Sequence, residues 1–421
     1  MSRSAIALLF LCALAAWTLL TCKNEPSAPA APKAAAKPAP PSELQHPTPD
    51  TDVENALNLM YGTAVVWRGG ENDLENSAVH ALDGFLDTTW TSAPGSPEET
   101  LVYSFLAARR IERVGATLVK TFAIDSVAFD ASMDGKTWHE LAKLKLENND
   151  QQQLVSVKPT DARYVRVRTF DPAGKYYVRV RTFHAMGAEV EPPRTPSFGG
   201  CWKINGVPAH IEQNGARITG VIETVPPIHL DGGTSDNRFG MVMWMQGGTR
   251  GEAVLTRSGD GEHITGLRFY EDVDSSNMGE GWFGERCEGR RGAGGTAAGA
   301  AAPQQFLARA KRYSLYGLAF DRNDRLIEEV SGPVLDTLVS LIASSPQRMS
   351  LVAHELRYAI PEQNKQHAAA RLQALRAALQ ARGVDLRRID FVAAGSDRNG
   401  SSLSSALQQA ALSRVDLIFG T

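Results

Sequence analysis

YVRVRTF occurs twice in this chain, at residues 164–170 and again at residues 177–183. Successive side chains of an extended strand alternate between its two faces, so each copy places its two valines on one face and its two arginines on the other. The residues between the copies, DPAGKY at residues 171–176, have the composition of a turn. The simplest prediction is a β-hairpin with one apolar face and one arginine-rich face.

Shorter β-prone runs surround this repeat, at residues 101–105, 113–118, 126–131 and 154–157, with turn residues between them. Short strands at regular intervals predict an all-β sandwich. The arginine-rich face, which holds Arg166, Arg168, Arg179 and Arg181, has two interpretations. It binds an anionic ligand, or it is the solvated outer face of a sheet, which is the simpler interpretation.

Two upstream motifs and the first copy of the repeat together resemble a known family. ALDG at residues 81–84 with DTTW at 87–90, SMDGKTW at 132–138 and ARYVRV at 162–167 have the order and spacing of discoidin domains, also called F5/8 type C domains. The resemblance implies a jelly-roll β-sandwich with a galactose-binding-like fold over residues 52–190. It also implies that loops at one end bind a carbohydrate, a phospholipid head group or another surface ligand.

Within this domain the first long loop region supplies the candidates for ligand contact, which are Trp67, Arg68 and Asn72. Two other tryptophans, Trp90 and Trp138, are expected in the core, because large aromatic side chains dominate the cores of sandwiches.

Many discoidin domains hold a structural calcium ion, and the matching loop here begins at Asp83. Carboxylate and carbonyl oxygens suit this ion. The resemblance therefore makes Asp83, Asp87 and Thr88 candidate calcium ligands. A glutamate in the last strand of family members usually completes the site, and this chain has Thr182 there.

A second domain is predicted at residues 198–288, where strand-like runs at 217–222, 241–245, 252–256 and 264–270 are separated by glycine turns. This pattern predicts a small antiparallel β-barrel. Cys201 lies in its first strand and Cys287 in its last. A closed barrel makes these strands neighbours and export exposes the protein to oxidising conditions, so we predict a Cys201–Cys287 disulfide, with two free buried thiols as the alternative.

The last predicted domain, residues 304–421, alternates helical and strand-like runs and is expected to be an α/β sandwich. Its strand at residues 349–354, its helix at 364–382 and RVD at 414–416 resemble the OmpA-like peptidoglycan-binding domain.

In the OmpA-like family an aspartate, and an arginine fifteen positions later, hold the charged ends of diaminopimelate. Arg371 matches the arginine, and Arg414 matches the second arginine of a pair in the last strand, where Ser413 replaces the first. Leu356 stands at the aspartate position. The neighbouring Glu355 is expected to face away from Arg371, because consecutive residues of a strand point to opposite faces. Peptidoglycan binding is therefore predicted in degenerate form.

The N-terminal residues 1–22 have the features of an export signal. Residues 5–20 form an apolar run behind Arg3 that is shorter than the ~20 residues needed to span a membrane. An uncleaved anchor helix is the alternative. LLTC at residues 19–22 resembles a bacterial lipobox, with Thr21 where the family prefers Gly, Ala or Ser, and makes Cys22 the predicted lipidation site. The Ala/Pro-rich residues 23–51 are expected to form a stalk, and residues 289–303 a Gly/Ala linker.

The formal net charge of -3 gives no electrostatic sign of nucleic-acid binding. No nucleophile elbow or His-Glu-x-x-His motif is present. The sequence thus predicts a non-enzymatic outer-membrane lipoprotein of the cell envelope. Its discoidin-like domain is expected to bind a carbohydrate or other surface ligand, and its OmpA-like domain to dock to peptidoglycan or an envelope protein. The alternatives are a structural scaffold that binds only proteins and an accessory part of a glycan-active enzyme.

Overall fold

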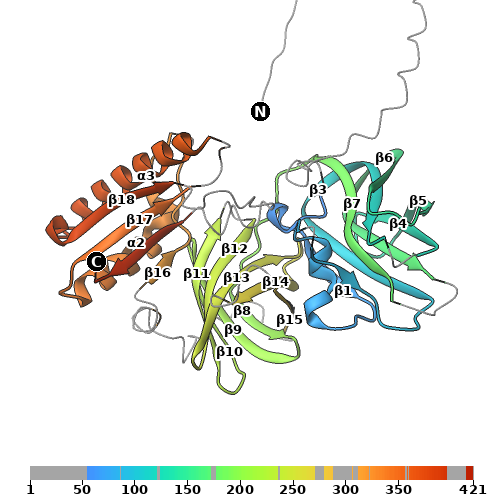
Figure 1. Ribbon diagram of the computed structural model, residues 1–421, viewed down its shortest axis with the longest axis horizontal. Helices are drawn as coiled ribbons and strands as arrows, with labels where there is room; N and C mark the ends of the chain where they lie inside the picture. The colour runs from blue at the N-terminus through green and yellow to red at the C-terminus, as the bar shows by residue number, and fades with distance from the viewer. Residues whose placement is uncertain are drawn as a thin grey trace, which may run out of the picture. The chain divides into compact units, whose positions relative to one another are not determined.

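The computed structural model describes residues 55–420, except residues 86, 121–123, 172–176, 236–237, 271–278, 288–305, 307–311, 322, 356–357, 359 and 396–413. Cys22, the predicted signal segment and both predicted linkers lie outside the described residues. Three modules follow one another along the described chain: a β-sandwich, a closed β-barrel and an α/β module (Figure 1). Within these residues, no helix is long and apolar enough to cross a membrane.

The first module confirms the predicted β-sandwich. Its strands run in the order β2-β7-β3-β6-β4-β5, with β1 paired to β3. Their bounds are Ala64–Arg68 (β1), Trp90–Thr91 (β2), Glu98–Leu118 (β3), Ser126–Ser132 (β4), His139–Lys145 (β5), Gln152–Phe170 (β6) and Arg179–Glu189 (β7).

The long strands β3 and β6 connect the two layers of this sandwich. They pair along most of their length, with a register shift between Ser104 and Arg109 of β3. Before the shift β3 also pairs with β1, and after it with β7. One layer therefore holds β1, β4 and β5 and the other holds β2 and β7, while β3 and β6 belong to both.

An aromatic core fills the space between the layers. Trp90 and Phe129 are fully buried and pack against Phe183, with ring centroids 5.9 and 6.3 Å away. Burial of three such side chains is a large apolar contribution to stability.

The predicted hairpin between the two YVRVRTF copies is wrong. The first copy lies in β6, between β3 and β4, and most of the second lies in β7, between β3 and β2. The alternation did predict the faces, because Val165, Val167 and Val180 are buried. Alternation with a period of two defines which side chains share a face, but it carries no information about which strands pair.

The second module is a closed antiparallel barrel, as predicted, and it is built from eight strands. Their bounds are Gly200–Ile204 (β8), Val207–Asn214 (β9), Arg217–Ile222 (β10), Ile228–Ser235 (β11), Phe239–Gln246 (β12), Thr249–Arg257 (β13), His263–Tyr270 (β14) and Glu280–Arg286 (β15). Trp202, Trp244 and Trp282 are buried in its own hydrophobic core.

The barrel closes where β15 pairs with β8, and the predicted Cys201–Cys287 disulfide lies at this closure. Only three residue pairs join these two strands, whereas β11 and β12 share eight. The disulfide is confirmed, and it reinforces the shortest strand pairing of the barrel.

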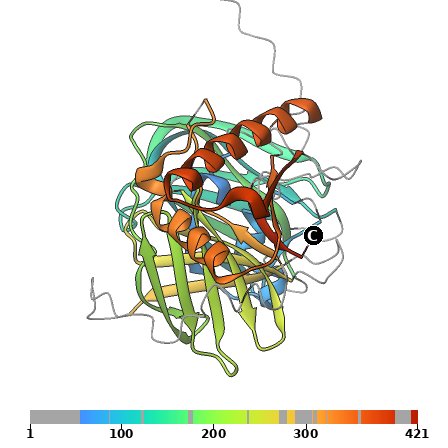
Figure 2. The ribbon, with the colours of Figure 1, turned by 90° about the vertical axis from the view of Figure 1, so that its left-hand side faces the viewer.

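The third module has a four-stranded sheet in the order β16-β19-β17-β18. Its elements are Arg312–Leu315 (β16), Glu328–Ser344 (α2), Met349–His354 (β17), Pro361–Ala381 (α3), Ile389–Gly395 (β18) and Val415–Phe419 (β19). Figure 2 shows both helices on the same side of the sheet, as right-handed crossovers between parallel strands require. The sequence did not predict β16.

Candidate functional site

The end of strand β1 and the loop that follows it hold the three candidates for ligand contact. Trp67, the fourth residue of β1, is 62% exposed, and no other tryptophan among the described residues is an exposed residue. Arg68 is engaged, because its Nη1 lies 2.6 Å from Glu71 Oε2 and its guanidinium lies 4.0 Å from the ring centroid of Phe283. Trp67 is therefore the more accessible of these two side chains.

Asn72 belongs to a polar network that fixes the shape of this loop. Its Nδ2 donates to Asp73 Oδ2 at 2.5 Å, while Asp73 Oδ1 accepts from the backbone N–H of Asn76 at 2.8 Å. Glu71 Oε1 accepts from the backbone N–H of Ala78, and burial raises the pKa of Glu71. The loop thus presents an exposed indole beside a polar rim whose shape is already set by internal hydrogen bonds.

Trp138 contradicts its expected place in the core. It is half-buried, and the guanidinium of Arg166 lies 4.7 Å from its ring centroid. Trp138 lies in the β4–β5 connection just before β5, and it covers the outside of the sheet. Trp90, by contrast, is fully buried as predicted.

The first pair of repeat arginines is organised by one buried carboxylate. Asp130 is 2% exposed, and its Oδ2 accepts from the Nε of both Arg166 and Arg168 at 2.9 Å. Arg168 also donates to Glu140 at 3.3 Å. The sequence missed Asp130 because its position on the same face as the arginines depends on strand pairing.

Of the three candidate calcium ligands, Asp83 is the one with a buried carboxylate. Asp83 is buried, and its Oδ1 accepts from the backbone N–H of Phe85 and from Thr88 Oγ1, both at 2.9 Å. Its Oδ2 has no hydrogen-bond partner among the described residues, and burial raises its pKa well above the ordinary value.

Asp87 is exposed, and the hydroxyl of Thr88 already donates to Asp83. Neither residue therefore supplies a second ligand for an ion bound at Asp83 Oδ2. Over the described ranges, no three His, Cys, Asp or Glu side chains gather in a way that could hold a metal ion. Calcium takes six to eight oxygen ligands. These side chains alone do not form a calcium site, and backbone carbonyls would have to supply the remaining ligands.

In the third module the expected orientation of Glu355 is wrong. Glu355 is fully buried, and its Oε2 forms an ion pair with Arg371 Nη1. Arg371 Nε also donates to Asp324 Oδ1 at 3.0 Å, and His367 Nδ1 lies 2.5 Å from Asp324 Oδ2. Glu355 follows the last residue of β17, where the alternation of the strand has ended, so its side chain is free to turn towards α3.

The arginine that the OmpA-like resemblance assigns to ligand contact is thus held by two carboxylates of its own module. Leu356 and Ser413 lie outside the described residues. Arg414 is 9% exposed and donates from Nε to Asp416 Oδ1 at 2.8 Å. Asp416 also lies 3.3 Å from His354 Nε2, and these partners lower its pKa although burial raises it.

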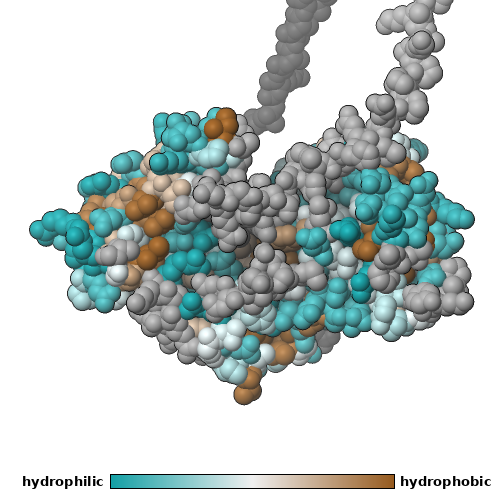
Figure 3. All heavy atoms as spheres, in the orientation of Figure 1, coloured by the Kyte–Doolittle hydropathy of each residue, from teal (hydrophilic) through white to brown (hydrophobic). Residues whose placement is uncertain are grey.

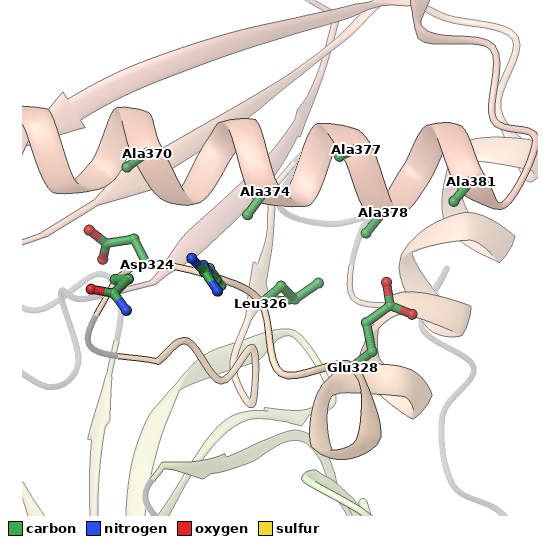
Figure 4. Close-up of a pocket in the computed structure, with 10 residues that line it drawn as sticks. Asp324, Leu326, Glu328, Ala370, Ala374, Ala377, Ala378 and Ala381 are labelled. Atoms are coloured by element: carbon green, nitrogen blue, oxygen red, sulfur yellow. The ribbon is translucent and has the colours of Figure 1, made fainter.

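A groove of about 520 Å³ lies beside this cluster. Figure 4 shows the alanines of α3 along one side and Asp324, Leu326 and Glu328 along the other. The acidic members are engaged, Asp324 by Arg371 and Glu328 by Arg382 at 3.3 Å. The groove presents small apolar side chains, and Arg325 is the one cation among its described lining residues.

Comparison with known proteins agrees with the fold of the sandwich. Residues 67–181 match the model of the F5/8 type C domain family. The β-sandwich of this chain is therefore similar to F5/8 type C domains over these residues. No match was found among curated proteins.

Similar solved structures include the C-terminal domain of a chitobiase from Bacteroides fragilis, with 23% identity, a TM-score of 0.29, and coverage of 31% of this chain and 96% of that chain. Another is CBM32-3 from a family 31 glycoside hydrolase of Clostridium perfringens, with 16% identity, a TM-score of 0.28, and coverage of 30% and 92%. A third is CpGH89CBM32-5 from Clostridium perfringens, in complex with GalNAc-β-1,3-galactose, with 14% identity, a TM-score of 0.27, and coverage of 31% and 99%. At these identities and TM-scores none of them indicates a ligand for this chain.

Proposed function

We propose that this protein is a non-enzymatic cell-envelope lipoprotein that binds a carbohydrate through its β-sandwich. The observation that carries the proposal is the F5/8 type C match at residues 67–181, which begins at the 62% exposed Trp67. An accessible aromatic ring beside fixed polar groups is the usual composition of a site for a sugar, whose ring has apolar C–H faces and a polar rim.

A glycan array probed with the chain from residue 23 onward tests this function. We expect binding to a defined set of glycans and a loss of at least tenfold in affinity for Trp67→Ala, because the indole supplies the apolar contact. The melting temperature of this variant should match that of the wild type, because the side chain is mostly exposed. Failure of the wild type to bind any glycan on the array would contradict the proposal.

We further propose that Cys22 carries the lipid that holds the protein in the outer membrane. The support is the short apolar run at residues 5–20 followed by LLTC. Several acyl chains at one terminus give firm attachment, whereas one gives marginal binding. Metabolic labelling with a palmitate analogue should mark the wild type and leave Cys22→Ser unlabelled. Labelling of the serine variant would remove the basis for a lipid at this residue.

The third module is proposed to dock the protein to peptidoglycan or to an envelope protein. Peptidoglycan binding is supported by Arg371, which stands at the position of the family's ligand-binding arginine. Because Arg371 is paired with Glu355 and Asp324, a protein partner and hence the scaffold function are favoured. Sedimentation with purified sacculi distinguishes the two. Retention that is lost in Arg371→Ala supports wall binding, and absence of wild-type retention leaves the scaffold.

A further inference from the structure

The outer face of one layer of the sandwich carries a continuous row of side chains. Strand register places Trp67, Val102 and Arg166 opposite one another on β1, β3 and β6. Asp130 on β4 and Glu140 on β5 continue the row. Residues directly opposite one another on neighbouring strands share a face of the sheet. Five strands about 4.8 Å apart give this outer row a length of about 19 Å.

The row lies on the outside because its neighbours along each strand point inwards. Leu101 and Tyr103 flank Val102 and are buried in the core, and Val165 and Val167 do the same around Arg166. Figure 3 shows a mainly hydrophilic surface over the part of the sandwich that faces the viewer, with hydrophobic residues only in small separate spots. By its residues, the outer row combines the exposed Trp67 and the partly buried Val102 with three charged side chains, Arg166, Asp130 and Glu140.

Two tryptophans give the outer row flat apolar surfaces. Trp67 stands at one end, 62% exposed, and Trp138 is partly buried beside Arg166. The C–H face of a sugar ring packs against such a surface while its hydroxyl groups remain directed sideways. Two platforms on one face suit a ligand with several rings in sequence.

Arg166 of the outer row and its neighbour Arg168 on β6 are fixed before any ligand arrives. Asp130 holds the Nε of Arg166 and of Arg168, and Trp138 supports the guanidinium of Arg166 from one side. Among the described residues nothing is hydrogen-bonded to the two terminal nitrogens of Arg166. They form a planar fork that matches a carboxylate, and little side-chain entropy is lost when they bind.

The charges of this face favour an acidic ligand. Arg166, Arg168, Lys143 and Lys145 oppose Asp130, Glu140 and Glu98, so four positive groups face three negative ones and leave one positive charge in excess. Asp130 and Glu140 balance Arg166 and Arg168, so the positive excess comes from Lys143 and Lys145 on β5. Protein interfaces are depleted of charged residues at their centres, and the centre of this face is charged.

We propose that the outer row binds a polysaccharide chain that carries carboxylate groups, with sugar rings on the tryptophans and a carboxylate on Arg166. The inference rests on the proposed carbohydrate binding and adds the ligand class and the surface. It assigns the contact to a sheet face and not to the loop network around Asn72. The polysaccharide chain runs across the strands, from Trp67 towards Arg166.

Affinity electrophoresis of the chain from residue 23 onward, in gels containing polygalacturonate or dextran, tests the proposal. We expect polygalacturonate to retard the wild type and dextran not to do so. Trp67→Ala and Arg166→Gln should each weaken binding at least tenfold. Arg110→Gln is the matched control and should leave binding within twofold. This exposed arginine lies in the part of β3 beyond the register shift, where it is paired with Asp161 of β6.

A second variant guards against a folding defect in Arg166→Gln. Val102→Glu adds a carboxylate between Trp67 and Arg166 without removing a contact of Asp130, and it should abolish retardation at an unchanged melting temperature. Equal retardation by dextran, or full binding by Arg166→Gln and Val102→Glu, overturns the proposal.

The outcome also separates this inference from the proposed function. If glycans on the array are bound and Asn72→Ala weakens that binding while Arg166→Gln does not, the loop is the site and the outer row is not. If the wild type binds no glycan in either experiment, the proposed function fails together with the inference.

Discussion

The disulfide across the barrel closure allows a quantitative prediction. Replacing both cysteines, Cys201→Ser with Cys287→Ser, removes the cross-link without leaving a reactive thiol. The bond joins residues 86 positions apart, and in the chain-entropy model a loop of that size stabilises the folded state by about 4–5 kcal/mol.

The structure indicates where this loss should appear. Only three residue pairs close the barrel between β15 and β8, so these strands depend on the cross-link more than their neighbours. A factor of ten in an equilibrium corresponds to about 1.4 kcal/mol, so 4–5 kcal/mol is roughly a thousandfold change in the population of the opened barrel.

Hydrogen exchange followed by mass spectrometry measures that population strand by strand. Peptides from β8 and β15 should exchange roughly a thousand times faster in the double serine variant, and the wild type under reducing conditions should behave in the same way. Peptides from β4 of the sandwich serve as an internal control and should not change. Acceleration of less than tenfold at β8 and β15 would refute the reasoning, because strand pairing would then hold the barrel closed by itself.

Three further perturbations test the other modules. Glu355→Gln should lower the free energy of unfolding by about 2–4 kcal/mol in a urea titration, because Arg371 keeps its buried charge; a change below 1 kcal/mol would contradict the buried pair. Calcium should change the melting temperature by less than about 1 °C relative to EDTA, and a rise of several degrees that Asp83→Asn abolishes would establish a calcium site. Gly233→Ala should destabilise the chain by about 1–3 kcal/mol, since its Cβ would lie 2.5 Å from the Tyr316 carbonyl oxygen; wild-type stability would show that the neighbouring backbone moves aside.

Periodicity and spacing were sufficient to predict much of the fold. The sandwich, the barrel and the disulfide followed from short strands, glycine turns and the positions of two cysteines. These features are local in the sequence, or they depend only on closure of the barrel, so they can be predicted from a single sequence. The separation of the two YVRVRTF copies could not be predicted in this way. The strand that lies between them in the sheet, β3, begins about 60 residues before the first copy.

The sites were harder to predict because side-chain partners come from distant strands. Asp130 meets Arg166 and Arg168 through strand register, and Glu355 reaches Arg371 through a turn of the backbone after β17. No spacing rule relates these residues. Trp138 was assigned to the core on the basis of residue type, and its stacking with Arg166 depends on the same register.

The two long strands of the sandwich have a consequence for how it folds and opens. Because β3 and β6 run through both layers, neither layer can detach without breaking strands of the other. The sandwich should therefore lose its structure in one cooperative step, with the slow kinetics expected when distant segments must meet first. A protease should consequently find its cleavage sites in the connecting turns and not in a partly opened layer.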